Sequence, residues 1–132
     1  MNAKELRIGN FVYNSASRSV EVCKVESITK LGVAYDSESR NGTCSIDNVK
    51  PIPLTEEWLR KFNAESYFTS DPQETQASKA FKFEDVKIHM CNEDVEEFMF
   101  ESFEFIKIKT VHQLQNLYFN LTETELTYKN EF

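Results

Sequence analysis

The amino-acid sequence predicts an α+β fold: a small N-terminal SH3-like β-barrel or curved meander, a middle helix, an antiparallel β-hairpin and a C-terminal helix. Three observations carry this prediction. Short runs rich in Val, Ile, Tyr and Thr alternate with turn residues over the first fifty positions. Two later segments show a helix cap followed by apolar residues at helical spacing. Between these two segments lies a Phe-rich stretch that is typical of paired strands.

The 132 residues have the size of one domain, and we expect residues 1–132 to form a single compact domain with subregions 1–53 and 54–132. Eleven Phe, five Tyr and one Trp supply large apolar side chains for its core. The sequence shows neither a run of 18 apolar residues nor a signal-peptide pattern. We therefore expect a cytoplasmic protein without membrane contact.

The N-terminal subregion is predicted to contain four or five short strands joined by tight turns. The strand-like runs cover residues 8–13, 20–28, 31–35 and 43–46. Asn41 and Gly42 are expected in a turn, because this pair tolerates the positive φ of a type I′ hairpin. Pro51 and Pro53 then end strand pairing, since proline donates no backbone hydrogen bond.

The middle helix is predicted to begin after Thr55, whose side chain can cap it, and to run to about Asn63. Its apolar face contains Trp58, Leu59 and Phe62. Residues 64–80 lose this periodicity and are expected to form a surface loop.

The aromatic residues of that loop are Tyr67 and Phe68, which either fold back onto the core or mark a partner site. The hairpin is expected to pair residues 81–91 with residues 98–109 around a turn near 92–94. Its apolar residues change parity within each predicted strand, so we expect at least one β-bulge.

The C-terminal helix is predicted from Thr110 and Gln113, which have the spacing of a capping box. We expect the helix to pack on the hairpin through one apolar stripe, with His112, Gln115, Asn116 and Asn120 mostly outside it. The stripe contains Val111, Leu114, Leu117, Tyr118 and Leu121.

Negative charge is concentrated in the second half of the chain. Residues 1–63 hold nine Lys or Arg and eight Asp or Glu, whereas residues 64–132 hold six and fourteen. We therefore expect a candidate interaction surface that combines the acidic hairpin residues with the two loop aromatics. It consists of Glu93, Asp94, Glu96, Glu97, Glu101, Glu104, Tyr67 and Phe68.

The sequence favours neither a metal site nor a catalytic centre. His89 and Cys91 share one face of a predicted strand, but the further ligands would have to come from His112 and Glu93, and no spacing requires that. Cys23, Cys44 and Cys91 are expected to be reduced structural thiols. No nucleophile, phosphate-binding or metalloprotease motif is present. We expect a non-enzyme without cofactor or metal.

Three segments together resemble a family of small uncharacterised proteins encoded by Bacteroidetes-type bacteria and their prophage-like elements. They are Glu5-Leu-Arg-Ile-Gly-Asn-Phe-Val-Tyr13, Pro51-Ile-Pro-Leu-Thr-Glu-Glu-Trp-Leu59 and Val111-His-Gln-Leu-Gln-Asn-Leu-Tyr-Phe119. The resemblance implies a cytoplasmic bacterial protein carried by a mobile element, and it implies no reaction.

The function we expect is that of a non-catalytic protein–protein interaction module or mobile-element accessory protein, which binds another protein or forms a homodimer. One alternative is an acidic nucleic-acid mimic that inhibits a DNA-binding enzyme by presenting carboxylates in place of phosphates. A second alternative is weak nucleic-acid binding by the N-terminal barrel. That alternative would use Arg18, Lys24, Lys30, Tyr35 and Arg40, and the net charge of +1 over residues 1–63 disfavours it.

Overall fold

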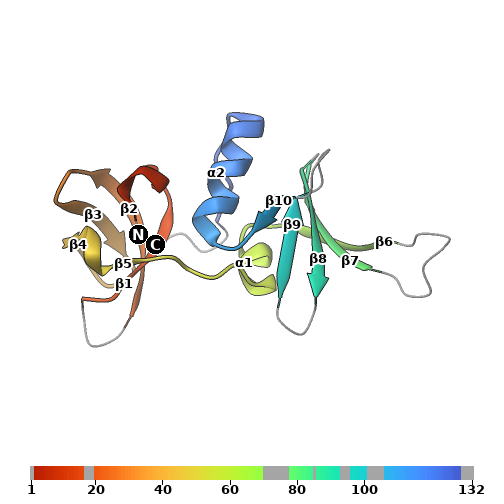
Figure 1. The fold of residues 1–132 in the computed structure, drawn as a ribbon, viewed down its shortest axis with the longest axis horizontal. Coiled ribbons are helices and arrows are strands. Elements are labelled where there is room, and N and C mark those ends of the chain that lie inside the picture. Colours follow the sequence, from red (N-terminus) through yellow and green to blue (C-terminus); the bar gives the residue numbers. More distant parts are fainter. Residues whose placement is uncertain are drawn as a thin grey trace. The chain divides into compact units, whose positions relative to one another are not determined.

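The computed structural model describes residues 2–16, 20–69, 78–84, 86–92, 96–100 and 106–128, and it confirms the α+β class (Figure 1). Contacts divide the chain into two compact units. The first extends to Pro53 and takes in Thr110–Thr124, whereas the second spans Leu54–Lys109 and part of the segment after Thr124. Each unit contains one five-stranded antiparallel sheet and one α-helix. That residues 1–132 behave as a single domain stays a prediction.

The sheet of the first unit is an antiparallel meander with its last strand returned beside the first. Its elements are η1 (Ala3–Glu5), β1 (Phe11–Asn14), β2 (Glu21–Ile28), β3 (Gly32–Ser37), β4 (Asn41–Ser45), η2 (Ile46–Asn48) and β5 (Val49–Lys50). The strand order is β4-β3-β2-β1-β5, and β2 carries a bulge between Val25 and Ser27. Because β4 and β5 do not pair with each other, the described residues show no closed barrel.

The predicted turn at Asn41 and Gly42 is wrong, because both residues lie in β4. The chain turns before these two residues, between the end of β3 and the start of β4, where the Ser37 amide donates to the Arg40 carbonyl oxygen at 2.9 Å. Gly42 instead pairs with Tyr35 across the sheet, and a Cβ atom at Gly42 would lie 2.9 Å from the Tyr35 hydroxyl oxygen. The glycine therefore makes room for the tyrosine ring.

The core of the first unit lies on one face of this sheet. It consists of Leu6, Val12, Cys23, Val25, Val33, Tyr35 and Val49. The Tyr35 hydroxyl, which reaches this core, accepts a hydrogen bond from the buried Asn14 side chain at 3.1 Å. A buried hydroxyl would otherwise lose its bond to water without compensation.

The C-terminal helix, α2, spans Val111–Thr122 and begins with the predicted capping box. The Thr110 hydroxyl accepts from the Gln113 amide, and the Gln113 side chain accepts from the Thr110 amide, each at 3.3 Å. Within the first unit α2 contacts β1, and the expected packing of the helix on the hairpin stays a prediction.

The buried face of α2 is also more polar than the apolar stripe predicted. His112 and Gln115 are each 2% exposed, whereas Leu121 is 51% exposed. The side chain of Gln115 accepts from the Phe11 amide at 2.8 Å and donates to the Gly9 carbonyl oxygen at 3.0 Å. The buried face thus keeps Val111, Leu114 and Tyr118 of the predicted stripe and extends to His112 and Gln115, which dock by packing and by hydrogen bonds to the backbone.

The neighbouring Asn116 completes the attachment of α2 to the N-terminal segment. Its carbonyl oxygen accepts from Arg7 Nε at 3.0 Å and from the Asn10 side chain at 2.9 Å. Its amide nitrogen donates to the Glu5 carbonyl oxygen at 2.9 Å. The Arg7 guanidinium also lies 4.2 Å from the centre of the Phe119 ring, a cation–π contact.

The second unit holds a sheet with the strand order β10-β9-β8-β7-β6. Its elements are α1 (Glu56–Lys61), β6 (Glu65–Thr69), β7 (Ser78–Phe83), β8 (Val86–Asn92), β9 (Glu97–Phe100) and β10 (Ile106–Ile108). Thr55 caps α1 as predicted. The surface loop expected at 64–80 is wrong for residues 65–69 and 78–80, because β6 and β7 pair in register from Glu65 opposite Lys82 to Thr69 opposite Ser78. Residues 70–77 of the predicted loop lie outside the described residues.

Within residues 81–91 the apolar residues change parity, and we predicted a bulge in one strand as the reason. The structure shows a different cause. The chain turns between Phe83 and Val86, which pair with each other, so two strands replace the single one expected. Glu84 begins this turn at a φ of 53°. The pairing of β8 with β9 confirms part of the predicted hairpin, and its register shift between Met90 and Asn92 confirms the expectation of at least one bulge. The single strand expected over 98–109 is wrong, because β9 and β10 both fall in this range and pair with each other.

Helix α1 is held to its unit by an ion pair and by aromatic packing. Lys79 of β7 donates to the Glu56 carboxylate, and this contact lowers the pKa of Glu56. The rings of Trp58 and Phe62 lie 5.8 Å apart, and the Tyr128 ring lies within 6 Å of both. These contacts fix the segment that leads from α1 into β6.

Replacing Gln115 by leucine tests whether α2 is anchored by its amide. We expect Gln115→Leu to destabilise the first unit by about 2 kcal/mol, because the buried Phe11 amide loses its acceptor. Urea unfolding together with hydrogen exchange at Phe11 measures this. Asn120→Leu, at an exposed position of the same helix, is the matched control and should change stability by less than about 0.5 kcal/mol. Equal effects of the two variants would contradict the anchoring role.

Candidate interaction surface

Strand β6 forms one edge of the second sheet and carries both aromatic residues of the predicted surface. Glu65, Ser66 and Phe68 are exposed, and Tyr67 is half-buried. Ser66 and Phe68 share one face of the strand because side chains alternate along it. The Phe68 side chain is 67% exposed, so its ring is available to a partner.

The two alternatives offered for the aromatic pair both occur, one at each residue. Tyr67 turns inward, and its hydroxyl is buried without a hydrogen-bond partner among the described residues. Phe68 points outward and packs little of its ring. Phe68 is thus a large apolar side chain that is exposed beside the open edge of the sheet.

Edge strands usually carry features that discourage pairing with other chains, and β6 carries few of them: its one charged residue is Glu65, at its first position. Natural edges are very short, or they contain Lys, Pro or other residues that disfavour strand pairing. Among the other described edges, β5 has two residues followed by Pro51, and β10 has three centred on Lys107. The β4 edge includes Asn41 and Gly42, residue types that are depleted in strands. The five residues of β6 include Tyr, Phe and Thr, and no Lys, Arg, Pro or Gly.

The acidic part of the predicted surface is described in part. Glu93, Asp94, Glu101 and Glu104 lie outside the described residues. Glu97 of β9 is bound to Lys107 of β10, with 3.5 Å between carboxylate and ammonium, and Glu96 precedes β9 at a φ of 50°. The described residues contain 13 Lys or Arg and 14 Asp or Glu, so the excess of carboxylates falls on the remainder.

The thiols and histidines form no reactive cluster in the part of the chain that the structure describes. No three His, Cys, Asp or Glu side chains there gather as metal ligands would. Burial, reinforced by the Glu21 carboxylate, raises the pKa of Cys23 to about 11. Burial also raises the pKa of Cys44. Both side chains are therefore protonated thiols at neutral pH, which are poor nucleophiles.

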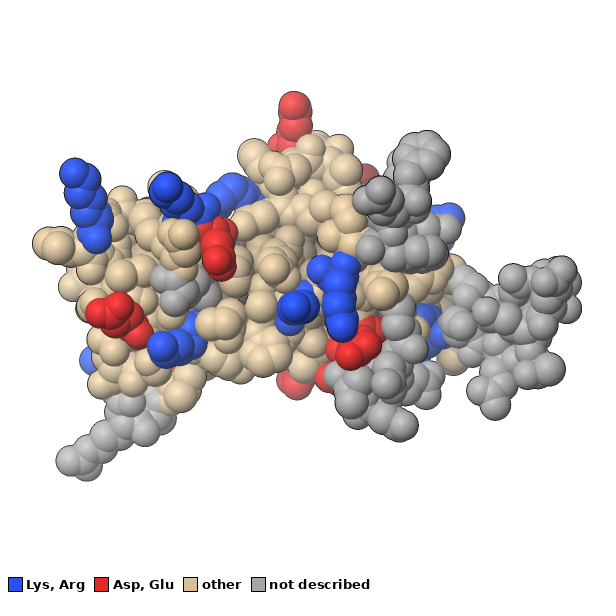
Figure 2. Space-filling view, in the orientation of Figure 1, with Lys and Arg blue, Asp and Glu red and all other residues tan. Residues whose placement is uncertain are grey.

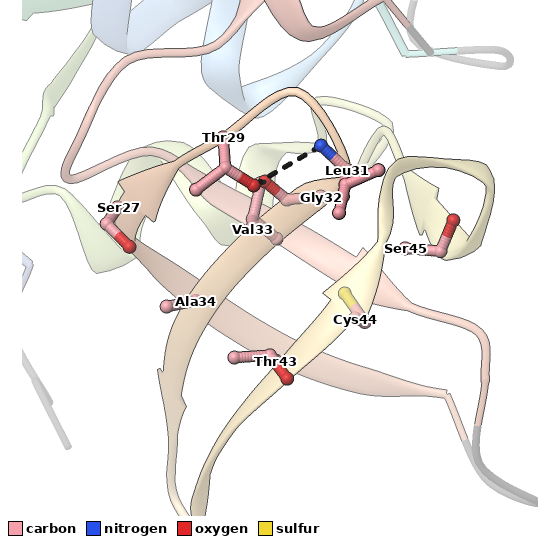
Figure 3. Close-up of a pocket in the computed structure, with 9 residues that line it drawn as sticks. All are labelled: Ser27, Thr29, Leu31, Gly32, Val33, Ala34, Thr43, Cys44 and Ser45. Atoms are coloured by element: carbon pink, nitrogen blue, oxygen red, sulfur yellow. Dashed lines mark hydrogen bonds between the residues drawn. The ribbon is translucent and has the colours of Figure 1, made fainter.

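A groove of about 390 Å³ crosses one end of β2, β3 and β4 in the first unit (Figure 3). Hydroxyl groups of Ser27, Thr29, Thr43 and Ser45 line it together with small apolar residues. The nine lining residues include no charged side chain. The groove therefore offers neither an acid–base pair nor a counter-ion for a charged ligand.

The residues expected to bind nucleic acid are not assembled for that purpose. Tyr35 is 3% exposed, so its ring cannot stack on a base. Arg40 lies 3.3 Å from the Glu21 carboxylate. On the face shown in Figure 2, basic and acidic side chains are interspersed. Arg18 lies outside the described residues.

Sequence reasoning named Phe68 but missed that it stands on a strand. The run Glu65-Ser-Tyr-Phe-Thr69 contains three residue types with high β-propensity, and this was the available signal. The polar residues that follow obscured it. The amide network of Gln115 and Asn116 left no signal in the hydrophobic periodicity.

Comparison of the chain with protein-family models, curated proteins and solved structures finds no match. Among the described residues, no helix has both the length and the apolar character that crossing a membrane requires.

His112 lies at the start of α2 with its ring buried. Neither ring nitrogen has a hydrogen-bond partner among the described residues, and Nε2 lies 3.6 Å from the Glu5 carboxylate. Burial lowers the pKa of His112, and the Glu5 carboxylate offsets this lowering in part. The neutral ring is therefore favoured in the folded state.

The stability of the first unit should consequently depend on pH. As the pH falls below about 6.5, the unfolded chain takes up a proton at His112 before the folded chain does, so the free energy of unfolding decreases. His112→Leu should flatten the decrease between about pH 7 and pH 5, and Glu5→Gln should steepen it. Urea unfolding across this range measures the slopes. Identical slopes in all three proteins would contradict this role of His112.

Proposed function

We propose that the chain is a non-catalytic protein–protein interaction module whose β6 edge accepts an extended strand of a partner. The observation that carries the proposal is the weakly protected β6 edge with the exposed Phe68 ring. In strand addition, main-chain hydrogen bonds supply affinity and alternate side chains supply specificity. Phe68 would be the specificity residue, because it is the large apolar side chain of β6 that is exposed.

The remaining contacts support a scaffold role for the rest of the second unit. The face of the sheet that carries Ser66 and Phe68 is filled, farther from the edge, by buried residues of β7, β8 and β9, including Phe81, Ile88 and Phe98. Lys79 and Glu56 tie α1 to the strand next to β6. A strand that is paired with a packed neighbour is preorganised for a partner, which lowers the entropic cost of binding.

For the first unit we propose an SH3-like β fold, which the strand order β4-β3-β2-β1-β5 supports. The likeness to mobile-element proteins remains part of this proposal, and parts of its three segments contact one another in the first unit. The Val111 amide donates to the Ile52 carbonyl oxygen at 2.9 Å, while Gln115 and Asn116 bind residues 5–11. These contacts serve packing, and we place the partner site elsewhere.

A comparison of two charge-introducing variants tests the proposal. Phe68→Lys places on β6 the residue that natural edges use against pairing. Leu31→Lys makes a similar change at an 85%-exposed position of the first unit. Affinity capture from the host lysate, followed by quantitative mass spectrometry, measures the amount of specific partner bound. Compared with the wild-type chain, Phe68→Lys should capture at least about tenfold less of this partner, and Leu31→Lys nearly the same amount.

Melting temperatures of the variants verify that both remain folded. Equal capture by the wild-type chain and Phe68→Lys would overturn the β6 site. Failure of the wild-type chain to capture any specific protein, its own copies included, would overturn the function as an interaction module.

A further inference from the structure

We propose that the occupant of the β6 edge is the β6 strand of a second copy of this chain, paired antiparallel in a two-fold symmetric dimer. This inference rests on the proposed function, since it names the partner of the same edge. A two-fold dimer of this kind joins the two sheets into one continuous ten-stranded sheet, given five strands in each copy.

In the register that we propose for these five residues, the two-fold axis passes next to Tyr67. If Tyr67 faces Tyr67 of the second copy, then Ser66 faces Phe68 of the second copy and Phe68 faces its Ser66. Residue i thus contacts residue j and j contacts i, as a two-fold interface requires. A small exposed side chain stands opposite a large exposed one at both places, so the Phe68 ring finds space.

Charge favours this antiparallel arrangement over a parallel one. Glu65 is the only ionisable residue of β6 that is charged at neutral pH, and it is exposed. In the antiparallel register the two Glu65 residues stand four positions apart, about 13 Å along the strands. That separation exceeds the Debye length of about 8 Å at physiological salt, so their repulsion is screened. Parallel in-register pairing would place the two carboxylates directly opposite each other.

The edge strand and its neighbour also leave that interface free of uncompensated charge. Glu65 lies 3.4 Å from Lys82 of β7, and Lys79 of β7 is bound to Glu56. The pairing surface is therefore nearly neutral, with its contacts made by main-chain groups, Ser66 and Phe68. Since five residue pairs bury little area, we expect a weak, concentration-dependent dimer.

Register-specific cross-linking of the full chain tests the dimer. Ser66→Cys and Phe68→Cys chains are mixed at a high concentration of about 0.5 mM, where weak complexes form, and mildly oxidised. Residues directly opposite each other are close enough for a disulfide, whereas 66 with 66 and 68 with 68 are offset along the strands. The mixture should give at least about tenfold more cross-linked dimer than either variant alone.

Wild-type protein treated in the same way sets the background from Cys23, Cys44 and Cys91. Sedimentation equilibrium from about 1 μM to about 1 mM should show the wild-type chain associating and Phe68→Lys associating at least about tenfold more weakly. A mixture that cross-links no more than the single variants, or a wild-type chain that is monomeric throughout, overturns the dimer. If lysate capture of a different protein still depends on Phe68 in that case, the proposed function stands with another occupant. If capture from the lysate does not depend on Phe68 either, the dimer and the proposed function are both overturned.

Discussion

The hydrogen bonds between the Gln115 side chain and the backbone of Gly9 and Phe11 are the constraint on which the first unit depends. They join residues more than a hundred positions apart and do so through a group that is 2% exposed. A buried amide is stable only when its donor and acceptor are both used, so this contact specifies one docking position for α2. The Asn116 contacts with Arg7 and Asn10 reinforce the same position. The chain thereby closes on itself and leaves residues 54–109 as a separate compact unit.

That closure accounts for the contrast between the two units. In the first, α2 is bonded to Ile52 and to residues 5–11, and the exposed groove contains hydroxyls without charge. In the second, the sheet ends in a strand that keeps its apolar Phe68 ring in water and has Glu65 as its one charged residue. The proposed interaction function therefore fits the second unit better, because this strand edge with its exposed ring is a feature that an enzyme mechanism would leave unexplained.

Local signals in the sequence were sufficient for the helices and insufficient for several strands. Thr55 and Thr110 predicted the starts of both helices because capping involves residues within one turn. Gly42 was a misleading turn signal, since the residue is needed to accommodate Tyr35, a contact made only across the sheet. The turn at Glu84 was missed because it contains no Gly, Asn or Pro. Likewise, the β-propensity of residues 65–69 is a weak signal for β6 beside the polar residues that follow, and Gln115 became a core residue only by docking. Phe68 was identified from its sequence neighbourhood, but its role as an edge residue required the sheet.

Amide hydrogen exchange over Glu65–Thr69, compared between dilute and concentrated protein, shows whether β6 is the edge at which the chain associates. We expect the outward-facing amides of β6 to exchange freely when the chain is dilute and to become protected as it associates, while exchange in β4 and β10 stays unchanged. Unchanged exchange in β6 with and without an associated partner would contradict the claim that this edge is the site of interaction.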